Sequence, residues 1–182
     1  TATTGLDHID LEECKKRGVK VISLQGETEF LQEITSTAEH TIGLIVALLR
    51  NYKTALNEPY RDREFYKGHT LREKTLGIIG YGRVGKQVHR LADSFGMNVL
   101  YFDLIRKIGA TMSNAKGKYI EAFDSLLKES DIVSIHIPLQ GNEGFFTKEM
   151  FEQMKPTAYF VNTSRSKVVE DGSDKRIDCK LS

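Results

Sequence analysis

The clearest pattern of apolar and polar positions in this 182-residue chain lies between residues 74 and 103. A short apolar run over 75–79 leads into Gly80-Tyr81-Gly82-Arg83-Val84-Gly85. Apolar residues then recur at the spacing of one helix face, and a second apolar run over 99–102 ends at Asp103. The pattern predicts a strand, a glycine turn, a helix and a second strand with an acid at its end.

This arrangement is typical of dinucleotide binding. Gly80 permits a tight turn, Gly82 lets backbone N–H groups approach a pyrophosphate, and Gly85 lets helix and strand pack closely. The phosphates would lie at the positive end of the helix dipole. Asp103 is placed to accept hydrogen bonds from the adenosine ribose, and it would repel a 2′-phosphate. We therefore expect NAD, rather than NADP, as the cofactor.

The chain before this segment divides into a small unit and a long helix. A short helix over 11–17, a strand over 19–24 and an irregular connection over 26–35 are predicted first. Apolar positions then recur at helical spacing to Pro59, which predicts one continuous helix over Ala38, Ile42, Ile45, Leu49, Tyr52 and Leu56. Ser36 and Glu39 have the spacing of a capping box. A buried crossing helix and a dimerisation arm both fit this stripe.

The remainder alternates between strands and helices. A loop is expected over 60–71, and a loop or short helix over 105–116. Strands are predicted at 118–120, 132–137 and 158–161, with helices at 122–127 and 148–154. The fold class is therefore α/β, a Rossmann-type doubly wound parallel sheet with strand order 3-2-1-4-5.

Ligands of such sheets bind beyond the carboxyl ends of the strands. The predicted strand ends carry Gly80, Gly82, Asp103, His136 and the segment from Thr163 to Arg165. His136 fits either a packed imidazole or a wall of the cofactor pocket. Arg165 fits either a surface cation or a guanidinium that holds a carboxylate through two parallel hydrogen bonds.

Composition and charge narrow the functional classes. The formal net charge of +1 gives no electrostatic reason to expect nucleic acid or an anionic membrane as a partner. Cys14 and Cys179 belong to no cluster with metal-ligand spacing, which favours free thiols, no metal and a reducing compartment. The longest apolar run, over 42–49, is too short to span a bilayer. We expect a cytoplasmic protein.

Five segments, in this order, resemble the D-isomer-specific 2-hydroxyacid dehydrogenase family, which includes formate, glycerate, D-lactate and phosphoglycerate dehydrogenases. They are TTGLDHIDL, TAEHTIGLIVALLR, KTLGIIGYGRVGKQVHRLADSFGMNVLYFD, LLKESDIVSIHIPL and MKPTAYFVNTSR. The resemblance extends from Thr3 to about Asp171. It implies an NAD-dependent oxidoreductase that transfers hydride between NAD and a small 2-hydroxy or 2-oxo acid.

The resemblance also implies roles for individual residues. Thr4 and Gly5 would face the substrate, and Arg165 would be the catalytic arginine that orients the 2-oxo acid. The helix over 37–57 would join the domains and form a homodimer. The cofactor would be held by Gly80, Gly82, Arg83, Val84, Gly85, Asp103, His136, Ile137, Thr163 and Ser164.

The chain also departs from the family pattern. Ser166 stands where members carry glycine, and the tail over 172–182 has no counterpart. Residues 1–26 read as a remnant of the substrate domain and 27–171 as the NAD-binding domain, so the fold is expected to be incomplete. The family's catalytic glutamate and histidine have no match, which predicts weak or absent turnover. A non-catalytic NAD(H)-binding or oligomerisation module, or a gene fragment, are the alternatives.

Overall fold

The computed structural model describes residues 1–58, 62–104 and 117–173, and the chain divides into two units, 1–35 and 36–182. The first unit contains helices α1 (Leu11–Lys16) and α2 (Thr28–Gln32). Asp10 caps α1 by accepting the Glu13 amide at 2.8 Å, and Gly18 follows it at a φ of 67°. The predicted strand over 19–24 is wrong, because residues 1–35 contain no second strand with which it could pair. The predicted irregular connection is also wrong in part, since α2 lies within it.

The second unit is built on five parallel strands in the order β3-β2-β1-β4-β5, as predicted. The strands are β1 (Thr75–Ile79), β2 (Asn98–Phe102), β3 (Lys118–Tyr119), β4 (Ile132–Ile135) and β5 (Tyr159–Asn162). Ile79 is in register with Phe102 on one side and Ile135 on the other. The three central strands therefore end level with one another, and the residues that follow them emerge together.

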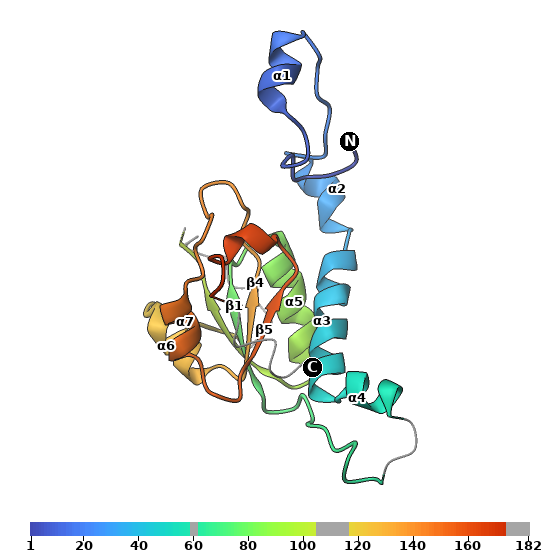
Figure 1. The fold of residues 1–182 in the computed structure, drawn as a ribbon, viewed down its shortest axis with the longest axis vertical. Coiled ribbons are helices and arrows are strands. Elements are labelled where there is room, and N and C mark those ends of the chain that lie inside the picture. The colour runs from blue at the N-terminus through green and yellow to red at the C-terminus, as the bar shows by residue number, and fades with distance from the viewer. Residues whose placement is uncertain (59–61, 105–116, 174–182) are drawn as a thin grey trace. The chain divides into compact units, whose positions relative to one another are not determined.

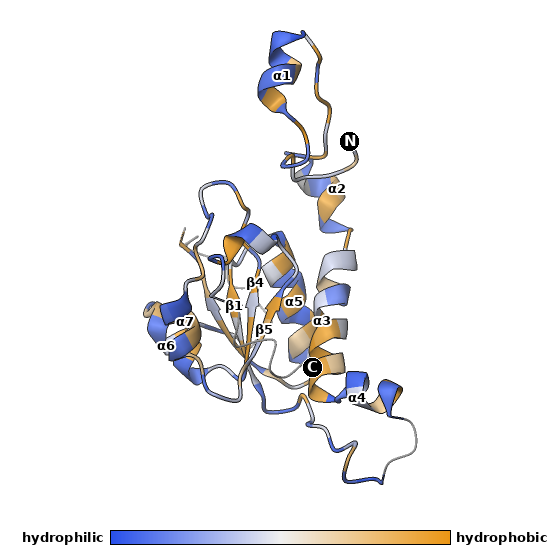
Figure 2. Ribbon diagram, viewed as in Figure 1, coloured by the Kyte–Doolittle hydropathy of each residue, from blue (hydrophilic) through white to orange (hydrophobic). Residues whose placement is uncertain are grey.

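Helices cover both faces of this sheet (Figure 1). Helices α3 (Ser36–Leu49) and α5 (Arg83–Ser94) lie on one face, and α6 (Phe123–Glu129) and α7 (Lys148–Gln153) lie on the other. Successive residues of β1 point to opposite faces, so Leu76 and Ile78 enter the first core and Ile79 the second. Figure 2 shows apolar residues along the strands and a mixture of apolar and polar residues along the helices beside them.

The long helix predicted up to residue 56 is wrong, because it breaks after Leu49. Asn51 adopts a left-handed φ of 54°, and a separate helix α4 (Tyr52–Asn57) follows. The Leu49 carbonyl accepts the His69 amide at 2.7 Å instead of continuing the helical ladder. Tyr52 and Leu56 are 49% and 80% exposed, so the second half of the apolar stripe does not join the core of this unit.

The carboxyl part of the unit contains a short 3₁₀ helix, η1 (Ser166–Val168), that the sequence did not predict. Val169 then pairs with Phe146 in an isolated parallel bridge. The other elements agree with the predicted ranges to within about two residues. The segment predicted over 105–116, and the tail from residue 174, lie outside the described residues.

Asp131 fastens the amino edge of the sheet. Its Oδ2 accepts the Thr75 amide at 2.8 Å, and its Oδ1 accepts Lys155 Nζ at 2.9 Å. Asp131→Ala should lower the free energy of unfolding in urea by about 1–3 kcal/mol, because the Thr75 amide loses its acceptor. Lys148→Ala is the matched control, since it removes an exposed pair with Glu152 and should cost about 0.5 kcal/mol or less. Equal losses in the two variants would contradict the assignment.

Candidate functional site

The turn between β1 and α5 requires glycine for two physical reasons. Gly80 has a φ of 92°, and a Cβ there would lie 2.6 Å from the His136 carbonyl oxygen. A Cβ on Gly85 would overlap the Gly80 carbonyl oxygen, so this glycine sets how closely α5 approaches the strand. The chain can therefore leave β1 and enter α5 directly over the end of β4.

The amino end of α5 has the features that fit a pyrophosphate. Gly82 is its N-cap residue and provides no side-chain cap for the first amides. A Cβ built on Gly82 would meet nothing within 4 Å, so there is open space beside those amides. Arg83 and Val84 form the first turn, where backbone N–H groups and the helix dipole favour an anion.

Asp103 lies one residue past β2, beside the same turn. Its Oδ2 accepts the Tyr81 amide at 2.7 Å, which holds the carboxylate at the mouth of the glycine segment. The end of β2 is itself tied to the turn, since Gly80 donates its amide to the Phe102 carbonyl at 2.9 Å. A carboxylate fixed in this way fits the two hydroxyls of an adenosine ribose.

His136 follows β4 and is partly buried. Its Nε2 lies 2.9 Å from the Ser134 hydroxyl, and its backbone amide donates to the Ile79 carbonyl at 2.7 Å. Burial lowers the pKa of His136 to about 4, so the imidazole is neutral at physiological pH. Ile137, which is almost fully buried, packs beside it and contributes an apolar wall next to Gly80.

The segment after β5 is organised by Asn162. Its Oδ1 accepts the Ser164 amide at 2.9 Å and the Ser164 hydroxyl at 2.8 Å, while its Nδ2 donates to the Arg165 carbonyl at 2.9 Å. Arg165 Nη1 donates to the Ser164 carbonyl at 3.0 Å. These bonds fix the backbone that carries the Arg165 guanidinium at the edge of the sheet.

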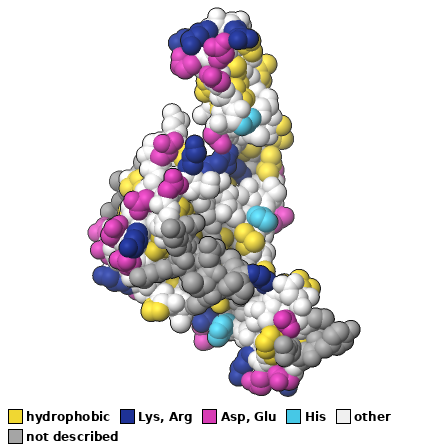
Figure 3. Space-filling view, in the orientation of Figure 1, with side chains coloured by type: hydrophobic (Ala, Val, Ile, Leu, Met, Phe, Trp, Pro, Cys, Tyr) yellow, Lys and Arg dark blue, Asp and Glu magenta, His cyan; other side chains and the backbone are white. Residues whose placement is uncertain are grey.

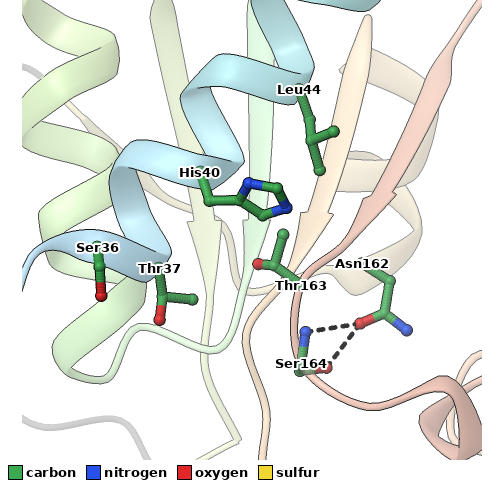
Figure 4. Close-up of a pocket in the computed structure, with 7 residues that line it drawn as sticks. All are labelled: Ser36, Thr37, His40, Leu44, Asn162, Thr163 and Ser164. Carbon is green, nitrogen blue, oxygen red and sulfur yellow. Dashed lines mark hydrogen bonds between the residues drawn. The ribbon is translucent and has the colours of Figure 1, made fainter.

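A hollow of about 470 Å³ lies between the start of α3 and the end of β5. Figure 4 shows His40 and Leu44 of α3 facing Thr163, with the Asn162–Ser164 bonds at the opposite wall. The hollow is lined by Ser36, Thr37, His40, Leu44, Asn162, Thr163 and Ser164. Thr163 also exchanges a hydrogen bond of 2.9 Å with Thr41, which joins this wall to α3.

The structure therefore brings most of the predicted site residues to one edge. These are Gly80, Gly82, Arg83, Val84, Gly85, Asp103, His136, Ile137, Thr163, Ser164 and Arg165. Thr4 and Gly5 belong to residues 1–35, and their place in a substrate site stays a prediction. Sequence reasoning missed the organising role of Asn162 and the Thr41 contact. A polar residue directly after an apolar strand was the available signal for Asn162.

The described surface adds little to this site. Acidic and basic side chains are interspersed on the face shown in Figure 3. Within the described ranges, no group of three or more His, Cys, Asp or Glu side chains could hold a metal ion. None of the described helices is both long and apolar enough to cross a bilayer.

The parallel sheet, the glycine turn and the acid after β2 define a Rossmann-type dinucleotide-binding domain. Residues 42–173 match the model of the D-isomer specific 2-hydroxyacid dehydrogenase, NAD binding domain. The chain belongs to this family, and the NAD cofactor expected from its glycine turn and acid is the family's cofactor.

Known proteins agree with this assignment. The chain is 34% identical over 179 residues to a glyoxylate reductase of Thermofilum pendens, covering 93% of the chain and 51% of the relative. It is 32% identical over 174 residues to a hydroxypyruvate reductase of Thermotoga maritima, covering 93% and 54%. The chain thus spans about half the length of the curated relatives it matches.

Solved structures share the fold. The NAD-dependent formate dehydrogenase of Staphylococcus aureus in complex with NAD superimposes with a TM-score of 0.81 at 29% identity, over 100% of this chain and 54% of that one. The D-lactate dehydrogenase of Aquifex aeolicus complexed with NAD and lactic acid gives 0.78 at 33% identity, over 98% and 53%.

The neutral state of His136 predicts a pH dependence of stability. Between its ordinary pKa of 6.5 and the folded value of about 4, the unfolded chain binds a proton that the folded chain does not, so stability falls as the pH falls. From pH 7 to pH 5 this group should cost the wild type about 2 kcal/mol of unfolding free energy. In His136→Gln, the loss of unfolding free energy from pH 7 to pH 5 should be smaller than in the wild type by about 2 kcal/mol. Urea unfolding followed by circular dichroism gives both values. Parallel curves for the two proteins would contradict the prediction.

Proposed function

We propose that this chain forms the coenzyme-binding part of an NAD-dependent D-2-hydroxyacid dehydrogenase, acting between NAD and a small 2-hydroxy or 2-oxo acid. The observation that carries the proposal is the pairing of an uncapped α5 amino end with a carboxylate held 2.7 Å from the Tyr81 amide. The first fits a pyrophosphate and the second a ribose. NADH, when bound, supplies the hydride.

The residues along the carboxyl edge of the sheet have different roles in this proposal. Gly80, Gly82 and Gly85 give the backbone room to approach the cofactor, and Asp103 accepts the ribose hydroxyls. His136 and Ile137, which follow β4, line the cofactor pocket together with Thr163 and Ser164, which follow β5. Arg165 binds the carboxylate of the 2-oxo acid and orients its carbonyl, because a guanidinium offers several donors in one plane.

The relatives favour a small substrate. Two of the relatives are named a glyoxylate reductase and a hydroxypyruvate reductase. Glyoxylate and hydroxypyruvate are short 2-oxo acids, so a single guanidinium contributes a large share of their binding free energy. Residues 1–26, which include Thr4 and Gly5, are assigned to the substrate domain in this proposal. A homodimer through residues 37–57 is supported by the exposed apolar side chains of Leu44, Tyr52 and Leu56. The cytoplasmic location stays a prediction.

A non-catalytic NAD(H)-binding module is the second candidate, because the α5 amino end and Asp103 account for cofactor binding alone and a fold does not fix a reaction. The two functions differ in whether NADH is consumed. For residues 1–182 we expect NADH binding with little turnover of glyoxylate or hydroxypyruvate. Turnover is measured as the loss of NADH absorbance. Turnover matching that of a full-length relative would exclude the non-catalytic module.

Asp103→Ala tests the cofactor assignment. Loss of a charge-assisted hydrogen bond to the ribose should raise the Kd for NADH about 10-fold, while the Kd for NADPH stays level or falls. Glu129→Gln is the control, because it neutralises an exposed acid at the carboxyl end of α6 and should leave both constants unchanged. Both constants are measured by fluorescence titration. An unchanged NADH constant in Asp103→Ala would refute the role of this carboxylate.

Arg165→Gln tests the substrate assignment. It should weaken glyoxylate binding to the NADH complex on the order of 10-fold or more, because the carboxylate loses its ionic partner. The Kd for NADH itself should change little. Arg90→Gln, which alters an exposed arginine on α5, serves as the control. The affinities are compared by calorimetric titration of glyoxylate into the NADH complex of the wild type and of each variant. Equal affinities in all three proteins would contradict the assignment of substrate binding to Arg165.

A further inference from the structure

Tyr81, the residue between the first two glycines of the turn, is fixed from three directions. Its side chain is only 4% exposed, and its ring stacks on Tyr101 with centroids 3.8 Å apart and planes at 18°. Its hydroxyl lies 2.5 Å from His89 Nδ1. Its backbone amide donates to Asp103 at 2.7 Å. The same residue thus touches both the interior and the carboxylate of the site.

His89 is an unusual partner for this hydroxyl. It lies on α5 with no exposed surface, and among the residues that the structure describes its buried Nε2 has no hydrogen-bond partner. Its ring packs so closely on Gly117 that a Cβ there would overlap it. Burial lowers the pKa of His89, although Asp93 opposes this, and burial raises the pKa of Tyr81 to about 12. The pair is therefore a neutral imidazole and a protonated phenol, joined by one hydrogen bond.

No sequence motif links His89 to Tyr81, so the contact between them is a product of the fold. Tyr81 leaves the end of β1, and His89 lies on the buried side of α5, so the fold brings the two side chains together. A buried polar pair of this kind costs free energy unless its members satisfy each other.

We propose that Tyr81 is a positioning residue that sets cofactor specificity: its side chain, held by His89 and Tyr101, keeps the residue-81 amide on the Asp103 carboxylate. The inference rests on the proposed function, because it assumes that Asp103 binds the ribose. Gly80 and Gly82 flank Tyr81, and two glycines leave a backbone with many accessible conformations. The anchored ring removes that freedom. The carboxylate is then fixed where it accepts ribose hydroxyls and repels a 2′-phosphate.

The hydroxyl can be removed without disturbing the stack. Tyr81→Phe should raise the Kd for NADH about 3- to 10-fold, the usual worth of one hydrogen bond, and change the Kd for NADPH less. The preference for NADH over NADPH should therefore narrow. Tyr81→Leu, which also removes the stacked ring, should narrow it further.

A double variant separates positioning from folding. Tyr81→Phe leaves His89 with no partner on Nδ1, which should lower the melting temperature. The double variant Tyr81→Phe with His89→Leu removes both polar groups, so its melting temperature should lie between those of Tyr81→Phe and the wild type. The narrowed cofactor preference should remain in the double variant, because the anchor is still absent. Ser130→Ala is the control: it deletes a buried hydroxyl bonded to the Leu126 carbonyl at the opposite edge, so it should lower stability and keep the preference.

The outcomes are distinguishable at a temperature well below every melting transition. If Tyr81→Phe and Tyr81→Leu keep the wild-type ratio of NADH to NADPH constants, Tyr81 is structural only and the inference is overturned. If Asp103→Ala also keeps that ratio, the ribose assignment of the proposed function has failed, and the inference fails with it. A narrowed ratio in Asp103→Ala and in the Tyr81 variants, with Ser130→Ala unchanged, supports both.

Discussion

The close approach of three strand ends at Gly80 is the constraint on which the rest of the structure depends. The Gly80 amide binds the Phe102 carbonyl, and the His136 amide binds the carbonyl of Ile79. Any side chain at position 80 would collide with the His136 backbone. This contact fixes where α5 begins, how far Asp103 extends past β2, and where His136 leaves β4. The site is thus a consequence of backbone pairing before any side chain contributes to it.

A second connection holds the other end of the edge. The Thr41 hydroxyl donates its one proton to the Thr37 carbonyl at 2.8 Å, so it accepts the hydrogen bond of 2.9 Å from the Thr163 hydroxyl. Asn162 organises the same segment through its side-chain amide. Helix α3 therefore supports the segment after β5, as α5 supports the segment after β1. Because each support packs on the same face of the sheet, the two halves of the edge keep a fixed spacing.

The sequence predicted those parts of the fold that depend on local pattern. The segment from 74 to 103 carries its own strand, turn and helix signals, and the strand order follows from them. The break at Asn51 could not be read in the same way, because it depends on the His69 amide reaching the Leu49 carbonyl. Apolar residues recur at helical spacing through position 52 even though the helix itself ends at Leu49. The strand predicted at 19–24 failed for a related reason: apolar residues favour a strand only where a partner strand exists.

The site also combines features that follow from local sequence pattern with features that depend on tertiary contacts. Gly80, Gly82 and Asp103 follow from motif spacing, whereas the Tyr81–His89 pair is a tertiary contact that no spacing predicts. The structure also shows the order of charges along the carboxyl edge of the sheet. Asp103 follows β2, the positive end of α5 follows β1, neutral His136 follows β4, and cationic Arg165 follows β5.

An extended dinucleotide presents ribose hydroxyls, a pyrophosphate and a nicotinamide in that order, and a 2-oxo acid beside the last adds a carboxylate. An acid suits the first, a helix amino end the second, and a cation the last. In the proposed function, a charged imidazole at position 136 would add a positive charge beside the nicotinamide, whose ring is cationic in its oxidised form. In the proposed function, the burial that keeps His136 neutral leaves the positive charge on this side of the sheet to Arg165, where a substrate carboxylate would need it.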